Sequence, residues 1–93
     1  MARKYNGWHR RTVFDDNGAE TFINYYKYLK VDGNNILVSI IGDKENRKLI
    51  ERIEKNNIIL KEIMFAPEND IIKQAKNIAR KYRPDDYIKT YIL

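Results

Sequence analysis

The pattern of hydrophobic and polar residues contains one short continuous apolar run, Ile36–Ile41, in which only Ser39 is polar. Turn-forming residues flank this run, with Asp-Gly-Asn-Asn before it and Gly-Asp after it. An apolar run of this length between turn signals is typical of a strand that is buried on both faces. Such a strand normally lies in the centre of a sheet, so the run predicts a central strand.

Two further strands are predicted ahead of this run. Trp8–Phe14 has weak strand character, and Asn17-Gly18 after it can supply the positive φ angles of a hairpin turn. Thr21–Val31 is rich in β-branched and aromatic residues, which favours a strand. A helical period also fits this stretch, but turn signals at both of its ends favour the strand. With a second tight turn at Asp32-Gly33, the first half of the chain is predicted to form a three-stranded antiparallel meander.

A helix is predicted to follow the central strand, beginning at Asp43 as its N-cap and ending at Asn56-Asn57. Ile58–Phe65 then reads as a fourth strand. An alternative is one helix over Lys44–Ala66, because apolar residues continue beyond the asparagine pair. The pair itself and the β-branched residues after it favour the break. The apolar stripe of the shorter helix comprises Leu49, Ile50 and Ile53.

The clearest amphipathic helix lies between Pro67, which suits a first helical position, and Pro84, which ends the helix. Beyond it, Tyr87–Leu93 alternates well enough to predict a last strand. The apolar stripe of this helix comprises Ile71, Ile72, Ala75, Ile78, Ala79 and Tyr82.

The predicted fold class is α+β, or small α/β, with the element order β-β-β-α-β-α-β. The three-stranded antiparallel meander continues as βαβαβ in a single mixed sheet with two helices, and right-handed crossovers would make the last three strands parallel. We expect one domain over residues 1–93, in which residues 1–7 form a basic arm that can be flexible. The element order over residues 1–56 resembles that of the small arm-binding domains of phage integrases, and no motif residue extends the resemblance to a site.

Composition limits the class of protein. The chain is 43% hydrophobic and 33% charged, which is typical of a globular protein rather than a disordered one. It has no cysteine, which excludes disulfides and thiolate metal sites. Neither a signal-peptide pattern nor an apolar run of membrane-spanning length occurs, so we expect no membrane association and a cytoplasmic location.

The net charge is +5, and the positive charge is concentrated at the two ends of the sequence. The first 14 residues carry four basic and no acidic side chains, whereas residues 15–66 are nearly balanced. Such asymmetry suggests a polyanionic partner. The alternative is that a small domain needs a net charge of this size for solubility.

Few residues could carry catalysis. The sequence has one serine, Ser39, inside the most apolar strand, and one histidine, His9, near a basic terminus. Nucleophilic catalysis needs a nucleophile and a base within hydrogen-bond reach, which this placement does not favour. The carboxylate pairs Asp15-Asp16 and Asp85-Asp86 lie in predicted turns, where aspartate is expected for backbone reasons. We therefore expect no enzyme, no metal site and no cofactor.

Basic residues on the last helix and in the N-terminal arm form the first candidate binding surface. On the helix, Lys73, Lys76, Arg80 and Arg83 share one face and could follow a phosphate backbone. A solvated polar face is the alternative. The arm combines aromatic residues with positive charge, which suits groove insertion or base stacking. Trp8 belongs to this candidate surface as a stacking residue, and packing of its ring on the core is the alternative that we favour for it. The basic residues of the arm are Arg3, Lys4, Arg10 and Arg11.

The strand over Thr21–Val31 gives a second candidate surface. Its aliphatic face should meet the core, so the opposite face would display Phe22, Tyr26 and Tyr28 in a row with Lys30. An aromatic row beside a lysine can stack unpaired bases or anchor a protein partner. A helix covering this row is a third possibility.

These features predict a small non-enzymatic nucleic-acid-binding protein that is accessory or regulatory, directed to DNA, and encoded by a phage or other mobile element. Neutralising about five phosphates would give a slope of log K against log salt near −4.5. The alternative is a small inhibitor of the anti-defence type that binds a host protein or nucleoprotein complex through the same basic and aromatic face. An unpaired edge strand would also allow a homodimer.

Overall fold

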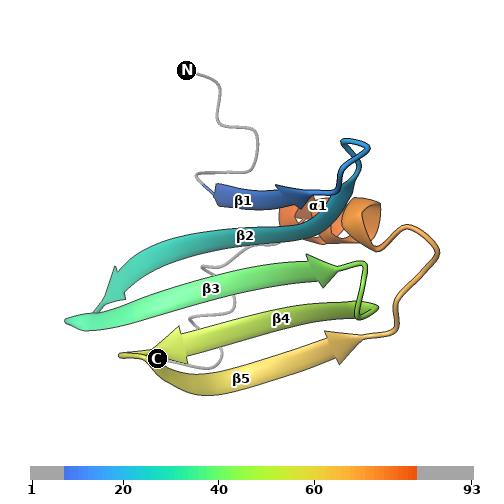
Figure 1. Ribbon diagram of the computed structural model, residues 1–93. Coiled ribbons are helices and arrows are strands. Elements are labelled where there is room, and N and C mark those ends of the chain that lie inside the picture. Colours follow the sequence, from blue (N-terminus) through green and yellow to red (C-terminus); the bar gives the residue numbers. More distant parts are fainter. Residues whose placement is uncertain (1–7, 82–93) are drawn as a thin grey trace.

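A computed structural model describes residues 8–81 as a five-stranded antiparallel sheet with one helix packed on one of its faces (Figure 1). The strands lie in the sheet in the order in which they occur in the chain, β1-β2-β3-β4-β5. The elements are β1 (His9–Phe14), β2 (Glu20–Val31), β3 (Asn34–Asp43), β4 (Lys48–Lys55), β5 (Ile58–Phe65) and α1 (Ile71–Lys81).

The predicted meander of β1, β2 and β3 is confirmed, and β3 lies in the centre of the sheet. The turn between β2 and β3 is the two-residue loop Asp32-Gly33, in which both residues have positive φ (50° and 80°). This conformation matches the twist of the flanking strands and fixes the register that places Tyr26 opposite Ser39. The burial of β3 is less symmetric than predicted, because Ile36, Val38 and Ile40 are fully buried on one face while the other face is only partly covered.

The predicted fold class is wrong in its second half. β4 occupies the region in which both the shorter helix and the alternative Lys44–Ala66 helix were expected. Residues 8–81 therefore hold a mostly β structure with one helix, not a βαβαβ unit with two helices, and the sheet is antiparallel throughout. The element order that resembled integrase arm-binding domains disappears with this helix.

Glu51 explains why the helical pattern was misleading. Leu49, Glu51 and Ile53 point to the face of the sheet that α1 covers, and all three are buried. In such a strand every second residue is normally apolar, but Glu51 in the middle of this set interrupts the alternation. The remaining apolar residues, Leu49, Ile50 and Ile53, happen to fit a helical spacing. Pairing with β3 and β5 on both sides overrides the local preference.

Asn56-Asn57 has the left-handed backbone conformation that the sequence predicts, but it does not end a helix. Both residues have positive φ (49° and 70°), as a helix end would require. Here they form the two-residue turn between β4 and β5. The Asn56 side chain also accepts a hydrogen bond from the Asn35 backbone N–H at 2.9 Å and donates one to Asn34 at 3.1 Å. These contacts tie this turn to the start of β3.

Asp43 does not cap a helix but closes the turn between β3 and β4. Its carboxylate accepts hydrogen bonds from the side chain of Asn46 at 2.8 Å and from the Asn46 backbone N–H at 3.2 Å. The side-chain hydrogen bond is the main reason why the pKa of Asp43 lies below its usual value. A lowered pKa means that the turn is stabilised at neutral pH and loses this contribution as the pH falls through that pKa.

The helix α1 lies across β2 and β3 and completes the core (Figure 1). It begins at Ile71, after Asp70 accepts a hydrogen bond from the Lys73 backbone N–H at 3.0 Å. Ile71, Ile72, Ala75 and Ala79 form its buried stripe, as predicted. The predicted last strand, Tyr87–Leu93, lies outside the described residues. Within residues 8–81 no helix is both long and apolar enough to cross a membrane.

Gly42 permits the close approach of α1 to the sheet. A Cβ atom at this position would lie 3.0 Å from the Cβ of Ala75 and 3.3 Å from the Ile71 carbonyl oxygen. We expect Gly42→Ala to lower the free energy of unfolding by about 1–3 kcal/mol, because backbone and a neighbouring Cβ must both move. Urea unfolding would measure this loss. Gly18, where a Cβ meets nothing within 4 Å but φ is +82°, provides a control for backbone strain alone.

Candidate functional site

Strand alternation gives the sheet one face that α1 covers and one that no described element covers, which we call the open face. In the paired register, side chains of opposite residues share a face, so the row His9, Tyr26, Ser39, Arg52 and Glu62 crosses all five strands on the open face. The predicted assignment of Phe22, Tyr26, Tyr28 and Lys30 to the face opposite the core is confirmed.

The aromatic residues of the open face are in contact with one another. The ring of Tyr26 stacks on His9 with centroids 5.3 Å apart and an interplanar angle of 26°. Tyr28 meets the same ring edge-on, with centroids 5.9 Å apart. Tyr28 is 66% exposed, whereas Tyr26 is half-buried between its neighbours. The three rings form a preorganised aromatic cluster that leaves ring surface open to a ligand.

A shallow hollow of about 260 Å³ lies beside the aromatic cluster. Its floor includes Ser39, whose small side chain is 4% exposed and leaves room next to Tyr26. Asn24 lines the hollow, and its Oδ1 atom accepts no hydrogen bond from any residue in the described range. The hollow therefore combines a ring, a cation and polar groups; its lining residues are Arg11, Asn24, Tyr26, Tyr28, Leu37 and Ser39.

The other half of the open face, over β4 and β5, has a different chemistry. Ile50 on β4 lies between Ile41 on β3 and Met64 on β5, and this row is apolar. In the next row, Arg52 binds Glu62 with an Nε–Oε2 distance of 2.7 Å, so their charges offset each other. The open face is thus aromatic and cationic over β1 and β2, and apolar and electrically balanced over β4 and β5.

The residues predicted to bind a partner do not share one surface. Trp8 is buried in the core, so the core alternative holds for it and it does not belong to a binding surface. Arg10 and the helix residues lie on the side of the sheet that α1 occupies. Arg3, Lys4 and Arg83 lie outside the described residues. Those on the open face are Arg11, Tyr26, Tyr28 and Lys30, and those on the helix are Lys73, Lys76 and Arg80.

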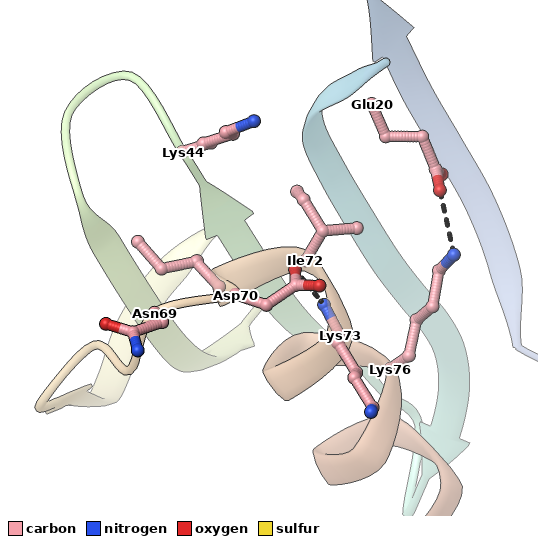
Figure 2. A pocket seen from close by; sticks show the side chains of 8 residues that line it. Glu20, Lys44, Asn69, Asp70, Ile72, Lys73 and Lys76 are labelled. Atoms are coloured by element: carbon pink, nitrogen blue, oxygen red, sulfur yellow. Dashed lines mark hydrogen bonds and ion pairs between the residues drawn. The ribbon is translucent and has the colours of Figure 1, made fainter.

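Lys76 is not available as a free cation on α1. Its Nζ binds Glu20 Oε1 at 2.8 Å, which connects the helix to the start of β2 (Figure 2). A hollow of about 600 Å³ lies beside this contact at the beginning of α1. Figure 2 shows Lys44 and Lys73 lining the hollow together with Glu20 and Asp70. The two carboxylates there offset most of the positive charge of the three lysines that line the hollow, so it offers little net attraction for a phosphate.

The histidine and the serine considered as catalytic candidates do not lie next to each other. Tyr26 lies between His9 and Ser39 on the open face, so two strand spacings, about 10 Å, separate the histidine from the serine. Among residues 8–81 no cluster of three or more potential metal ligands occurs. Asp15, the first of the predicted turn carboxylates, accepts hydrogen bonds from the Asn17 and Ala19 backbone N–H groups at 2.9 Å. Its role is that of a turn residue.

Asn24, Leu37 and Ser39 line the hollow but were not among the predicted site residues. For Leu37 and Ser39 the sequence contains a signal that could have placed them there. The two-residue turn Asp32-Gly33 fixes the register of β2 and β3, and this register alone places Ser39 beside Tyr26 and Leu37 beside Tyr28. The Asn17-Gly18 signal predicts the turn before β2, but the connection over 15–19 has five residues and the pairing shifts between Val13 and Phe14. This signal alone therefore does not fix Arg11 opposite Asn24.

Comparison with models of known protein families, with curated proteins and with solved structures finds no match for this chain. The function must therefore be argued from the site itself.

Proposed function

We propose that this chain is a non-enzymatic protein that binds single-stranded nucleic acid on the β1–β2 half of the open face. The observation that carries the proposal is the aromatic cluster of His9, Tyr26 and Tyr28 on the open face, which no element within residues 8–81 covers, with Arg11 beside it. Aromatic side chains on an open sheet stack unpaired bases, because every base presents a ring face.

Cationic side chains near the aromatic cluster support contact with the phosphate backbone of a nucleic acid. Arg11 lines the hollow, and Lys30 follows Tyr28 on the same face of β2. Both are exposed, so they can reach phosphates of a strand whose bases lie on the rings. A duplex presents its bases edge-on inside the helix and cannot stack on this cluster. We therefore expect a preference for single strands.

The salt dependence of binding tests which face is used. A strand on the open face would meet two or three cations, which gives a slope of log K against log salt of about −1.4 to −2.1 for single-stranded nucleic acid. Fluorescence anisotropy with single-stranded and duplex oligonucleotides across a salt series measures it. A slope near −4.5 with duplex preference would assign binding to the helix side and contradict the proposal, as would absence of binding at low salt.

A second candidate function has support from the other half of the open face. Ile41, Ile50 and Met64 form an apolar row that nucleic acid would not use. Met64 is exposed and the two isoleucines are half-buried, and an apolar row of this kind suits a protein partner, such as a host protein that a small inhibitor would bind. Pull-down from a host lysate with and without nuclease separates the two functions. A stoichiometric protein partner that survives nuclease would favour the second.

A further inference from the structure

The strand β5 forms one edge of the sheet, and within residues 8–81 no strand pairs with its outer side. The outward N–H and C=O groups of such an edge strand can pair with another strand. The edge is also apolar: Ile58, Ile59, Leu60 and Met64 are 48–68% exposed. Natural edge strands are usually protected by charges, proline or short length. β5 has eight residues, no proline, and only Lys61 and Glu62 as charges.

The opposite edge of the sheet has the protection that β5 lacks. β1 is six residues long and carries Arg10 and Arg11, so two copies that met there would bring four guanidinium groups together. The net charge of β5 is zero, because it carries one lysine and one glutamate. Two copies with a net charge of +5 each can thus approach most easily through β5.

We propose that β5 pairs antiparallel with β5 of a second copy of this chain, across a two-fold axis that passes near Ile63. A two-fold axis perpendicular to the sheet keeps both open faces on the same side, and it pairs residues whose numbers add up to an even number. Such an axis is centred on one residue of β5, which then lies opposite the same residue of the second copy. The choice of this central residue decides which other side chains become opposite neighbours.

Among the possible centres from Leu60 to Ile63, charge and geometry favour Ile63. A centre at Lys61 would oppose two lysines, and one at Glu62 would oppose two glutamates. A centre at Leu60 falls at the irregularity where this residue has no opposite neighbour on β4. With Ile63 at the centre, Glu62 lies opposite Met64 of the second copy, and Lys61 lies opposite its Phe65. No like charges then meet.

The resulting dimer would have one continuous sheet of ten strands, five from each copy, with both helices on one side. The two aromatic clusters would lie on the other side, one toward each end. An edge contact of about five residues buries less surface than most stable interfaces, so we expect association in the micromolar range. This inference does not depend on nucleic-acid binding.

Substitution of Met64 by charges of opposite sign tests the pairing and its register. Met64 is 63% exposed, so both Met64→Glu and Met64→Lys should preserve the fold, which circular dichroism can verify. Glutamate at this position would oppose Glu62 of the second copy twice in each dimer. We expect the dimer Kd to rise roughly 2- to 30-fold. Lysine would face the same carboxylates, and we expect the Kd to stay unchanged or fall.

Sedimentation equilibrium of the full chain without nucleic acid, over the micromolar range, measures these constants. Val13→Glu, on β1 and 45% exposed, is the matched control and should leave the Kd unchanged. A wild-type chain that stays monomeric at all concentrations would overturn the proposal. Equal weakening by Met64→Glu and Met64→Lys would also overturn it, because it would indicate an apolar contact without this register.

Discussion

Replacing Ile40 with alanine is expected to lower the free energy of unfolding by about 2–5 kcal/mol, the range for large-to-small changes at fully buried positions. Ile40 is 0% exposed in the centre of β3, between Tyr25 on β2 and Glu51 on β4. The rigid hydrogen-bonded strands on both sides prevent the sheet from closing the cavity. A domain of this length has a total stability of about 5–14 kcal/mol, so the loss would be a large fraction of it.

Urea unfolding followed by circular dichroism measures this effect. Val13→Ala is the control, because Val13 is an exposed aliphatic residue at the edge of the sheet, and its change should stay within about 0.5 kcal/mol. A loss below about 1 kcal/mol at Ile40 would contradict the assignment of the core to the α1-covered face of the sheet.

Replacing Tyr26 with alanine is expected to weaken binding of single-stranded nucleic acid by about 5- to 150-fold. The estimate follows from the 1–3 kcal/mol that base–aromatic stacking contributes for each base. Tyr26 has the largest expected effect because it contacts both other rings, with His9 stacked on one side and Tyr28 edge-on at the other. Its removal also opens the wall of the hollow that Arg11 lines.

Anisotropy titration with a labelled single strand measures the change, and two variants separate its causes. Tyr26→Phe keeps the ring and should retain most of the affinity. Phe14→Ala removes an aromatic side chain that is 60% exposed but lies outside the cluster, so it should have little effect. If Phe14→Ala weakened binding as much as Tyr26→Ala, the aromatic cluster would not be the site.

The charge pattern of the sequence suggested one basic surface built from both ends of the chain, and the structure separates its described members. The tyrosines and Arg11 lie on the open face, while Lys73 and Arg80 lie on the helix at the other side of the sheet. Lys76 is bound to Glu20. Helical spacing correctly placed these basic residues on α1, but nothing in that spacing shows which face of the sheet the helix will cover.

The sequence by itself determined the elements whose signals are local. Gly18 in the first turn and both residues of Asp32-Gly33 in the second have positive φ. Together with the apolar run Ile36–Ile41, these turn signals specify the first three strands. The amphipathic period specifies α1, and alternation along β2 shows that Tyr26 and Tyr28 share a face opposite the core.

Only the tertiary structure decided whether Leu49–Ile53 forms a strand or a helix. It also decided which side chains become neighbours in the hollow beside Tyr26. The buried Glu51 hides the strand period of β4. Hydrogen bonds of β4 to the neighbouring strands β3 and β5 select strand over helix. The hollow beside Tyr26 likewise needs Arg11 from β1 and Ser39 from β3. Pairing between strands brings such residues together, and the free energy of that pairing depends on the whole sheet rather than on any single segment.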